Sequence, residues 1–220
     1  DKVYVEKSND VLVNGKVYQK LGDKELYNGH IINGRPDSLW IEWYENGQKR
    51  QELTFKDGKE EGLSNWWYEN GQKRQKGNIK DGKQDGLWTS WYENGQKKEE
   101  GTWKNGKPDG LYTKWYENGQ KEQERTYKDG KKEGLSNWWY ENGQKRQEGN
   151  FKDGKPNGLG TSWFENGQKS SEGTYKDGER DGLTTIWFEN GQMMSKGTWK
   201  NGKPDGLLTI WYENGQKNLE

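Results

Sequence analysis

The chain of 220 residues carries 36 basic and 36 acidic side chains that alternate locally, so it lacks the basic stripe that nucleic-acid binding requires. A hydrophobic content of 26% would suit a disordered chain, but 14 Trp and 12 Tyr residues are too many for disorder. The absence of Cys excludes disulfides and thiolate metal sites, and no apolar run approaches the roughly 18 residues of a transmembrane helix. The composition therefore indicates a folded chain that buries large flat rings.

Residues 1–28 are the least regular part, and we expect them to form an N-terminal cap over the open edge of the fold. Asn14-Gly15 lies between β-branched residues of the stretch 11–18, which predicts a hairpin with a two-residue turn. The chain begins with Asp1 rather than Met. Together with the lack of Cys, this start favours export or a cell-surface location over the cytoplasm.

Residues 29–220 repeat one phrase every 24 residues, in which Leu is followed four positions later by Trp and then by an aromatic-Glu-Asn-Gly-Gln turn. Each of the eight units contains an Asn-Gly signal, as at Asn46-Gly47, and an Asp-Gly or Asn-Gly signal, as at Asp57-Gly58. Short segments rich in Trp, Tyr and Thr separate them. The sequence predicts an all-β fold, a single elongated, solenoid-like array of antiparallel hairpins, with two strands per repeat and type I′ turns.

Alternation within the strands assigns residues to faces. The Leu and Trp columns share parity and do not vary, so we expect them to form the structural core. The core residues predicted for the middle of the array are Leu87, Trp91, Leu111, Trp115, Leu135, Trp139, Leu159 and Trp163. The second strand contributes an aromatic or β-branched residue, such as Trp103, which follows a Gly that leaves room for the ring. Leu53 and Arg125 interrupt this glycine column, so their two units should pack differently.

The positions one residue out of phase with the invariant columns vary from repeat to repeat and form the candidate binding face. Its aromatic residues are Trp40, Trp66, Trp88, Tyr112 and Trp138, with the adjoining column Tyr44, Tyr68, Tyr92, Tyr116 and Tyr140. Exposed rings in a row would suit a protein partner, or sugar rings and quaternary amines. The alternative is that they cover the second side of a thin sheet. Segments 61–75 and 133–147 are nearly identical, which suggests duplication.

Titratable groups are spread evenly along the chain, whereas catalysis requires a constellation at one place. His30 is the only histidine, and we expect it to be structural. The repeated turn carboxylates, such as Glu93 and Glu117, would lie roughly 10 Å apart, too far for a shared metal ion or a retaining carboxylate pair. We expect Glu93 to face Lys97 across its turn instead. The sequence thus predicts no catalytic residues, no metal site, no cofactor and no enzymatic activity.

The string from Gly101 to Lys121 closely resembles the bacterial variant of the MORN repeat, and the resemblance extends over residues 29–217. It implies an array of β-hairpins and a non-enzymatic scaffold that binds a protein partner, either antitoxin-like or immunity-like, as in YwqK-type proteins, or associated with the cell surface. The other hypothesis is a glycan-binding or cell-wall-binding module of the choline type, which would use the exposed aromatic residues.

Overall fold

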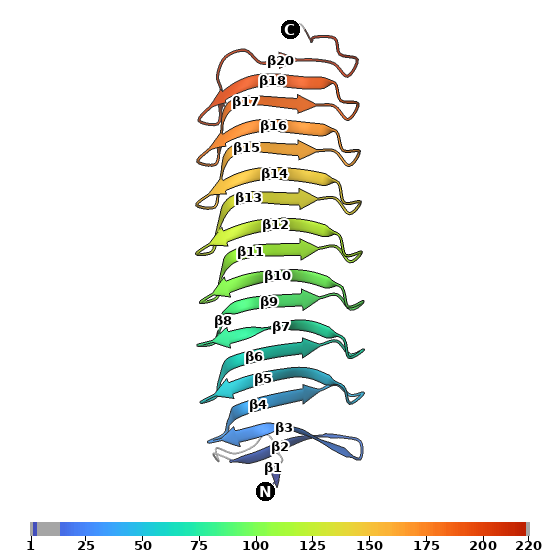
Figure 1. The fold of residues 1–220 in the computed structure, drawn as a ribbon, viewed down its shortest axis with the longest axis vertical. Coiled ribbons are helices and arrows are strands. Elements are labelled where there is room, and N and C mark those ends of the chain that lie inside the picture. The colour runs from blue at the N-terminus through green and yellow to red at the C-terminus, as the bar shows by residue number, and fades with distance from the viewer. Residues whose placement is uncertain (1, 4–13, 219–220) are drawn as a thin grey trace. The chain divides into compact units, whose positions relative to one another are not determined.

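The computed structural model describes residues 2–3 and 14–218, which form strands and turns with no helix among them. The chain divides into two compact units, residues 1–107 and 108–220. In both units consecutive strands pair as antiparallel hairpins, as the labels in Figure 1 show. The predicted all-β fold of hairpin repeats is confirmed.

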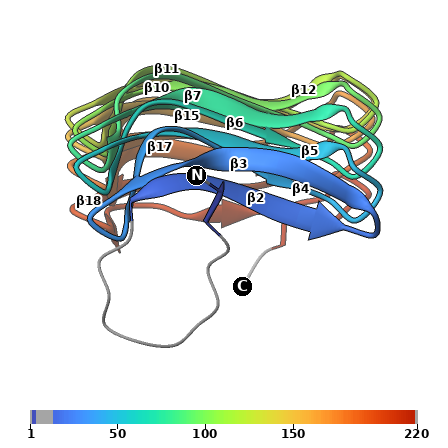
Figure 2. The same ribbon diagram turned by 90° about the horizontal axis from the view of Figure 1, so that it is seen from below.

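The strands of unit 1 are β1 (Lys2–Val3), β2 (Gly15–Leu21), β3 (Lys24–Ile32), β4 (Arg35–Trp43), β5 (Lys49–Lys56), β6 (Lys59–Trp67), β7 (Lys73–Lys80), β8 (Lys83–Gln84), β9 (Gly86–Trp91) and β10 (Lys97–Lys104). Seen from below in Figure 2, the long strands of this unit are bowed rather than straight. β1 pairs in parallel with β2. Unit 2 begins at Pro108, within the strand Lys107–Trp115.

The strands of unit 2 are β11 (Lys107–Trp115), β12 (Lys121–Lys128), β13 (Lys131–Trp139), β14 (Lys145–Lys152), β15 (Lys155–Trp163), β16 (Lys169–Lys176), β17 (Glu179–Trp187), β18 (Met193–Lys200), β19 (Lys203–Pro204) and β20 (Thr209–Ile210). From β11 to β18 each strand pairs with the next along the chain. The sheet order of this unit is therefore the sequence order.

A hairpin lies at the start of the described chain, at residues 15–32, and the hairpin predicted around Asn14-Gly15 is not tested by it. Gly15 is the first residue of β2, and the described hairpin joins β2 to β3 through Gly22 and Asp23. The strand expected before Asn14 falls on residues 11–13, which lie outside the described residues. Gly22 adopts a positive φ of 58°, the conformation that glycine reaches at low cost.

The two turn signals of each repeat have different geometries. At Asp57 and Gly58 both φ angles are positive, 52° and 75°, as a type I′ turn requires. At the other turn only Gly47 is positive, at 84°. There the Gly47 N–H donates to the Tyr44 carbonyl at 2.9 Å, and a register shift follows between Glu42 and Trp43. The prediction of a type I′ turn is therefore wrong for the Asn-Gly signal, which forms a longer loop with a bulge.

The two faces of the sheet are defined by residues that lie opposite each other across the strands. One face of each unit, which we call the variable face, has a central row of residues that differ from repeat to repeat. This row consists of Trp40, Leu53, Ser64, Gly77, Trp88 and Gly101 in unit 1, and of Tyr112, Arg125, Ser136, Gly149, Gly160, Gly173, Thr184 and Gly197 in unit 2. The aromatic residues of the second strand, such as Phe55, lie two residues from this row and so occupy the same face. The opposite face carries the Leu and Trp columns.

The leucine column is not a core, contrary to the expectation from the sequence. Leu87, Leu111, Leu135 and Leu159 are about half exposed, at 58%, 54%, 45% and 52%. The row beside them carries short polar side chains, as at Thr126 opposite Leu111, so little covers the leucines. The Trp residues of the same repeats, Trp91, Trp115, Trp139 and Trp163, are half-buried rather than enclosed.

The buried apolar side chains among the described residues all belong to unit 1: Ile31, Ile41, Leu53, Ile79 and Trp88. In unit 2 the buried positions carry polar residues: Thr113, Gln123, Ser136, Asn137, Thr161, Thr184 and Thr185. Both faces of a single sheet meet water, so only the middle of each face is covered. Unit 2 therefore depends less on aliphatic burial than unit 1 does.

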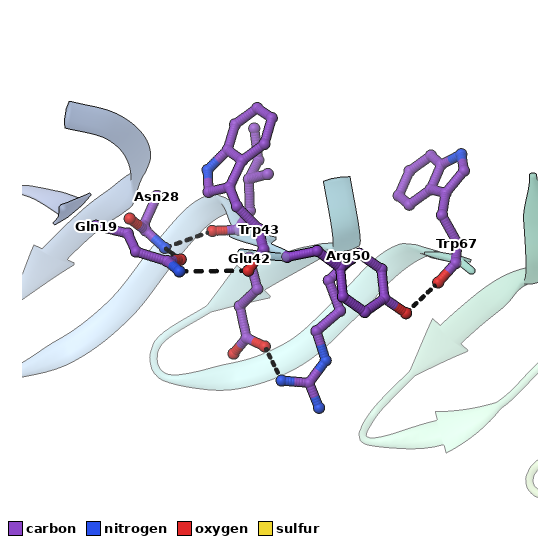
Figure 3. Close-up of polar contacts among 8 residues, drawn as sticks. Gln19, Asn28, Glu42, Trp43, Arg50 and Trp67 are labelled. Atoms are coloured by element: carbon purple, nitrogen blue, oxygen red, sulfur yellow. Dashed lines mark hydrogen bonds and ion pairs between the residues drawn. The ribbon is translucent and has the colours of Figure 1, made fainter. Parts of the chain in front are cut away.

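The invariant turn residues connect each repeat to the next. The Tyr44 hydroxyl donates to the Trp67 carbonyl at 2.8 Å, and the Asn46 side-chain amide donates to the Glu69 carbonyl at the same distance. In the cap, the Gln19 side-chain amide donates to the Trp43 carbonyl at 3.3 Å (Figure 3), so an amide performs there the role of the tyrosine hydroxyl. These bonds explain why the phrase does not vary between repeats.

Candidate functional site

The structure places Trp40, Trp66 and Trp88 on the variable face of unit 1, and Tyr112 and Trp138 on that of unit 2. They are not the exposed rings that the prediction of a binding face requires. Trp88 is only 6% exposed, and the other four are half-buried. The Trp66 indole N–H donates to the Ser64 hydroxyl at 3.0 Å, so its polar edge is already used. Whether any of these rings contacts a partner stays a prediction.

The tyrosine column has a structural role in both units. All five tyrosines, Tyr44, Tyr68, Tyr92, Tyr116 and Tyr140, are half-buried. The Tyr68, Tyr116 and Tyr140 hydroxyls donate at 2.8 Å to the carbonyls of Trp91, Trp139 and Trp163. Burial raises the pKa of the Tyr116 phenol, and the charge of Glu122 raises it further. These phenols therefore act mainly as connections between repeats.

The variable face of unit 2 holds a guanidinium among aromatic rings. Arg125 replaces the glycine of its column, and its Cζ lies 5.1 Å from the Tyr112 ring centroid and 5.4 Å from that of Tyr127. The two tyrosine rings meet edge to face, with centroids 6.2 Å apart. Such contacts stabilise a cation without neutralising its charge. Within the part of the chain that the structure describes, the buried Nε of Arg125 has no hydrogen-bond partner.

A second cation lies on the neighbouring strand. The Lys132 Nζ is 4.9 Å from the Phe151 ring centroid and 5.8 Å from that of Trp138. Burial lowers the pKa of the Lys132 ammonium, and the charge of Arg125 lowers it further. Among the described residues, neither Arg125 nor Lys132 forms an ion pair. Tyr112, Arg125, Tyr127, Lys132, Trp138 and Phe151 form what we call the basic-aromatic cluster.

A pocket of about 140 Å³ lies next to this cluster on the same face. Its floor includes Gly149 and Gly160, which lie opposite each other on β14 and β15, and its lining includes the rings of Phe151 and Tyr175. A methyl group added to Gly160 would lie 3.2 Å from the Tyr175 ring. The pocket thus exists because the central row carries no side chain at these positions.

Only one residue of this site stands out in the sequence. Arg125 was visible as an interruption of the glycine column, but Lys132 and Gly160 were not singled out, because neither residue is unusual for its place in a hairpin repeat. Their importance comes from register: Lys132 lies opposite Tyr127, and Gly160 lies between Gly149 and Gly173. These residues lie on five strands, β12 to β16, so their proximity cannot be predicted from the sequence of a single repeat.

The opposite face carries a regular set of ion pairs. Lys97 lies 2.7 Å from Glu100, and Lys169 lies 2.6 Å from Glu172, each pair on one strand. The expected pairing of Lys97 with Glu93 across the turn is therefore wrong, since the lysine extends along its own strand. These pairs are largely exposed and each contributes on the order of 0–1 kcal/mol. They keep the face solvated and do not form a site.

The described residues contain no group of three or more His, Cys, Asp or Glu side chains placed to hold a metal ion. Among the same residues, no helix offers an apolar stretch that could cross a bilayer. His30, on β3, is half-buried and lies opposite Lys16 and Asp37.

Comparison with family models agrees with the repeat seen in the strands. The model described as the MORN repeat variant matches residues 36–57, 60–81, 84–105, 108–129, 132–153 and 180–201. The model described as the MORN repeat matches residues 148–169 and 196–217. None of the curated proteins compared with the chain matches it. MORN repeats are generally binding modules, and no enzymatic family is indicated. With more than half of its length matched, the chain belongs to the family of MORN-repeat proteins.

Proposed function

We propose that the chain is a non-enzymatic scaffold that binds a protein partner through the variable face. The observation that carries this proposal is that the repeated positions hold the structure together, whereas other positions vary between repeats. The invariant Asn side chain of the turn and the Tyr that most repeats carry before it form bonds between repeats, as at Asn46 and Tyr44. The side chains of the variable face differ from one repeat to the next. Identical positions cannot distinguish one segment of a partner from another, so specificity belongs to the variable positions.

An antitoxin-like, immunity-like or surface-associated role is the narrower form of this proposal. Each would require a partner protein recognised along several repeats, which suits an array of half-buried rings and unpaired cations. A YwqK-type role rests only on the resemblance of the repeats. The neutralised toxin or the anchored surface protein would be the partner in these cases.

The glycan-binding or choline-binding alternative has less support. A sugar or quaternary amine needs an exposed ring face, whereas Trp88 is 6% exposed and the Tyr140 hydroxyl is bonded to a main-chain carbonyl. Arg125 and Lys132 would also repel a quaternary amine. Titration with choline and with cell-wall sugars should leave the Trp fluorescence unchanged.

The proposal is tested with variants that use residues the chain already carries at equivalent positions. The first variant combines Trp66→Ser with Trp138→Ser. Serine is the residue that two other repeats carry at this position, as Ser90 and Ser162. The control replaces the exposed Leu63 and Leu135 of the opposite face by Ser, which also removes apolar surface.

Cell extract from the organism of origin is passed over the wild type and both variants. We expect a protein that the wild type and the leucine variant retain and the tryptophan variant releases. Equal retention by all three proteins would contradict a role of the variable face, and the absence of any retained protein would contradict the scaffold function.

A further inference from the structure

Two parts of the variable face correspond residue by residue, three repeats apart. In unit 1, Trp88 occupies the central row between Gly77 and Gly101. A methyl group on Gly77 would lie only 2.1 Å from the Trp88 ring, which shows how closely the indole covers that glycine. The Trp88 indole N–H donates to the Asn78 carbonyl at 3.0 Å. Glycines on both sides thus make a slot that an indole fills.

In unit 2 the same row reads Gly149, Gly160 and Gly173, so the slot has no ring of its own. The pocket there measures about 140 Å³, against about 100 Å³ for the corresponding pocket beside Trp88. The lining rings are Phe151 and Tyr175, at the positions that Ile79 and Trp103 hold in unit 1. Asn150, the counterpart of Asn78, also lines the pocket.

The surroundings of the pocket differ in charge from those of its counterpart. Where unit 2 has Arg125 and Lys132, unit 1 has Leu53 and Glu60. The Lys132 Nζ lies 4.9 Å from the centroid of Phe151, the ring that also lines the pocket. A group that enters the pocket therefore comes close to Lys132, and Arg125 lies two strands away along the central row. Neither cation has an acidic partner among the described residues.

We propose that this pocket receives an aromatic side chain of the partner protein, and that Arg125 and Lys132 pair with acidic residues next to it in the partner sequence. The proposal rests on the scaffold function and names the chemistry of the segment recognised. Trp88 shows which shape fits between the paired glycines, and the cations supply the complementary charge. A neutral sugar would leave both cations unpaired in a partly desolvated site.

A phage-displayed library of random 12-residue peptides provides the probe. Peptides selected on the wild-type protein are expected to carry Trp, Phe or Tyr with Asp or Glu nearby. Gly160→Trp supplies the ring that unit 1 has at this place and should weaken their binding tenfold or more, by about 1.4 kcal/mol or more. Gly160→Thr, which has the residue of Thr184 in the same column, is the milder variant if the indole does not fit.

The cations are tested by Arg125→Leu with Lys132→Glu, which installs the residues of unit 1. Affinity should again fall about tenfold, and its salt dependence should decrease. The matched control, Lys128→Leu with Lys152→Glu, makes the same change of net charge at exposed residues of the opposite face, on β12 and β14. It should bind as the wild type does.

Two results would overturn this site. The first is that the selected peptides lack aromatic and acidic residues, or that the library yields no binding peptide. The second is selection of peptides whose binding is unaffected by the changes at Gly160, Arg125 and Lys132. In that second case, loss of binding in the variant with Trp66→Ser and Trp138→Ser would still support the scaffold function, but it would show that this pocket is not part of the binding surface. Thermal unfolding of each variant shows that the comparison is made between folded proteins.

Discussion

Unit 1 and unit 2 carry the same repeat, yet they fill the middle of the variable face in different ways. Around the nearly identical segments 61–75 and 133–147, unit 1 has Leu53, which is 4% exposed, and Trp88. Unit 2 has Arg125 and Gly160 at the corresponding positions. The invariant turn bonds hold both hairpin stacks. The central row is therefore free to change from an apolar filling to an open, positively charged one.

Not every charge difference between the units has this meaning. Arg50 lies 3.6 Å from Glu42 in unit 1, and the corresponding pair in unit 2 is reversed, with Lys114 2.9 Å from Glu122. The reversal preserves a cross-strand attraction and so is neutral for the fold. The exchange of Leu53 for Arg125 brings no acidic partner among the described residues, as the proposed binding role of Arg125 requires.

The largest expected effect comes from giving unit 1 the open slot of unit 2. Trp88→Gly removes a ring that is 6% exposed and packs on Gly77, so we expect a loss of about 3–5 kcal/mol. Urea unfolding followed by Trp fluorescence measures it. The reciprocal Gly160→Trp should cost less, because a pocket is present, but the Tyr175 ring must shift, since a methyl group on Gly160 would lie 3.2 Å from it. A loss below about 1 kcal/mol for Trp88→Gly would show that the two slots are equivalent in energy.

Two serines at matching positions should respond differently to replacement by Ala. Ser64→Ala leaves the Trp66 indole N–H without its acceptor and should cost about 1–3 kcal/mol. Ser136 is 0% exposed, and its hydroxyl has no partner among the described residues, so Ser136→Ala should be neutral or stabilising. Thermal unfolding of the two variants decides the matter. Equal losses would mean that Ser136 has the same bonding as Ser64.

A smaller effect is expected for the tyrosine column. Tyr140→Phe removes the hydroxyl that donates to the Trp163 carbonyl and should cost about 0.5–1.5 kcal/mol. Phe164 holds the equivalent place one repeat later, so Phe164→Tyr, which can form the same bond to Trp187, is the matched gain-of-bond control. Urea midpoints should shift in opposite directions. A stabilising Tyr140→Phe change would contradict the structural role.

The smallest effect concerns the two cations of unit 2. Burial and then Arg125 lower the pKa of Lys132, so Arg125→Leu should raise this pKa toward the ordinary lysine value of 10.5 without reaching it. Because the folded chain loses this proton before the unfolded chain does, the stability contributed by Lys132 increases as the pH rises through the interval between the two pKa values. A carbon-13 titration of the lysine side chains measures the shift. An unchanged pKa would place Arg125 farther from Lys132.

The repeat, the hairpins and the boundaries of most strands were predictable, because a period of 24 residues with two glycine turns admits few other folds. The assignment of the faces was not. Alternation correctly grouped Leu111 with Trp115, but it cannot tell which group is covered in a sheet that meets water on both sides. The positive φ of Gly110, 117°, and the shift at Trp115 also interrupt the regular alternation.

The candidate site was predictable only as a face. The sequence indicates that Trp66 and Trp138 share a column, and the structure shows that one of them bonds to a serine hydroxyl while the other lies near Phe151, with centroids 6.2 Å apart. Such differences arise from neighbours on adjacent strands. The pocket at Gly160 depends on Gly149 and Gly173, which belong to other strands. No local sequence motif indicates that these three glycines lie side by side.

The tyrosine hydroxyls also set the order in which unit 2 should open. They reach the carbonyls of Trp139 and Trp163, whereas Phe164 and Phe188 have no oxygen with which to continue the series. The last hairpins are then joined by one side-chain contact fewer per repeat, and neighbours are the only source of stability in a repeat array. Amide hydrogen exchange should therefore be fastest from β17 onward and should slow toward β13, as local fraying at the C-terminal end precedes global unfolding.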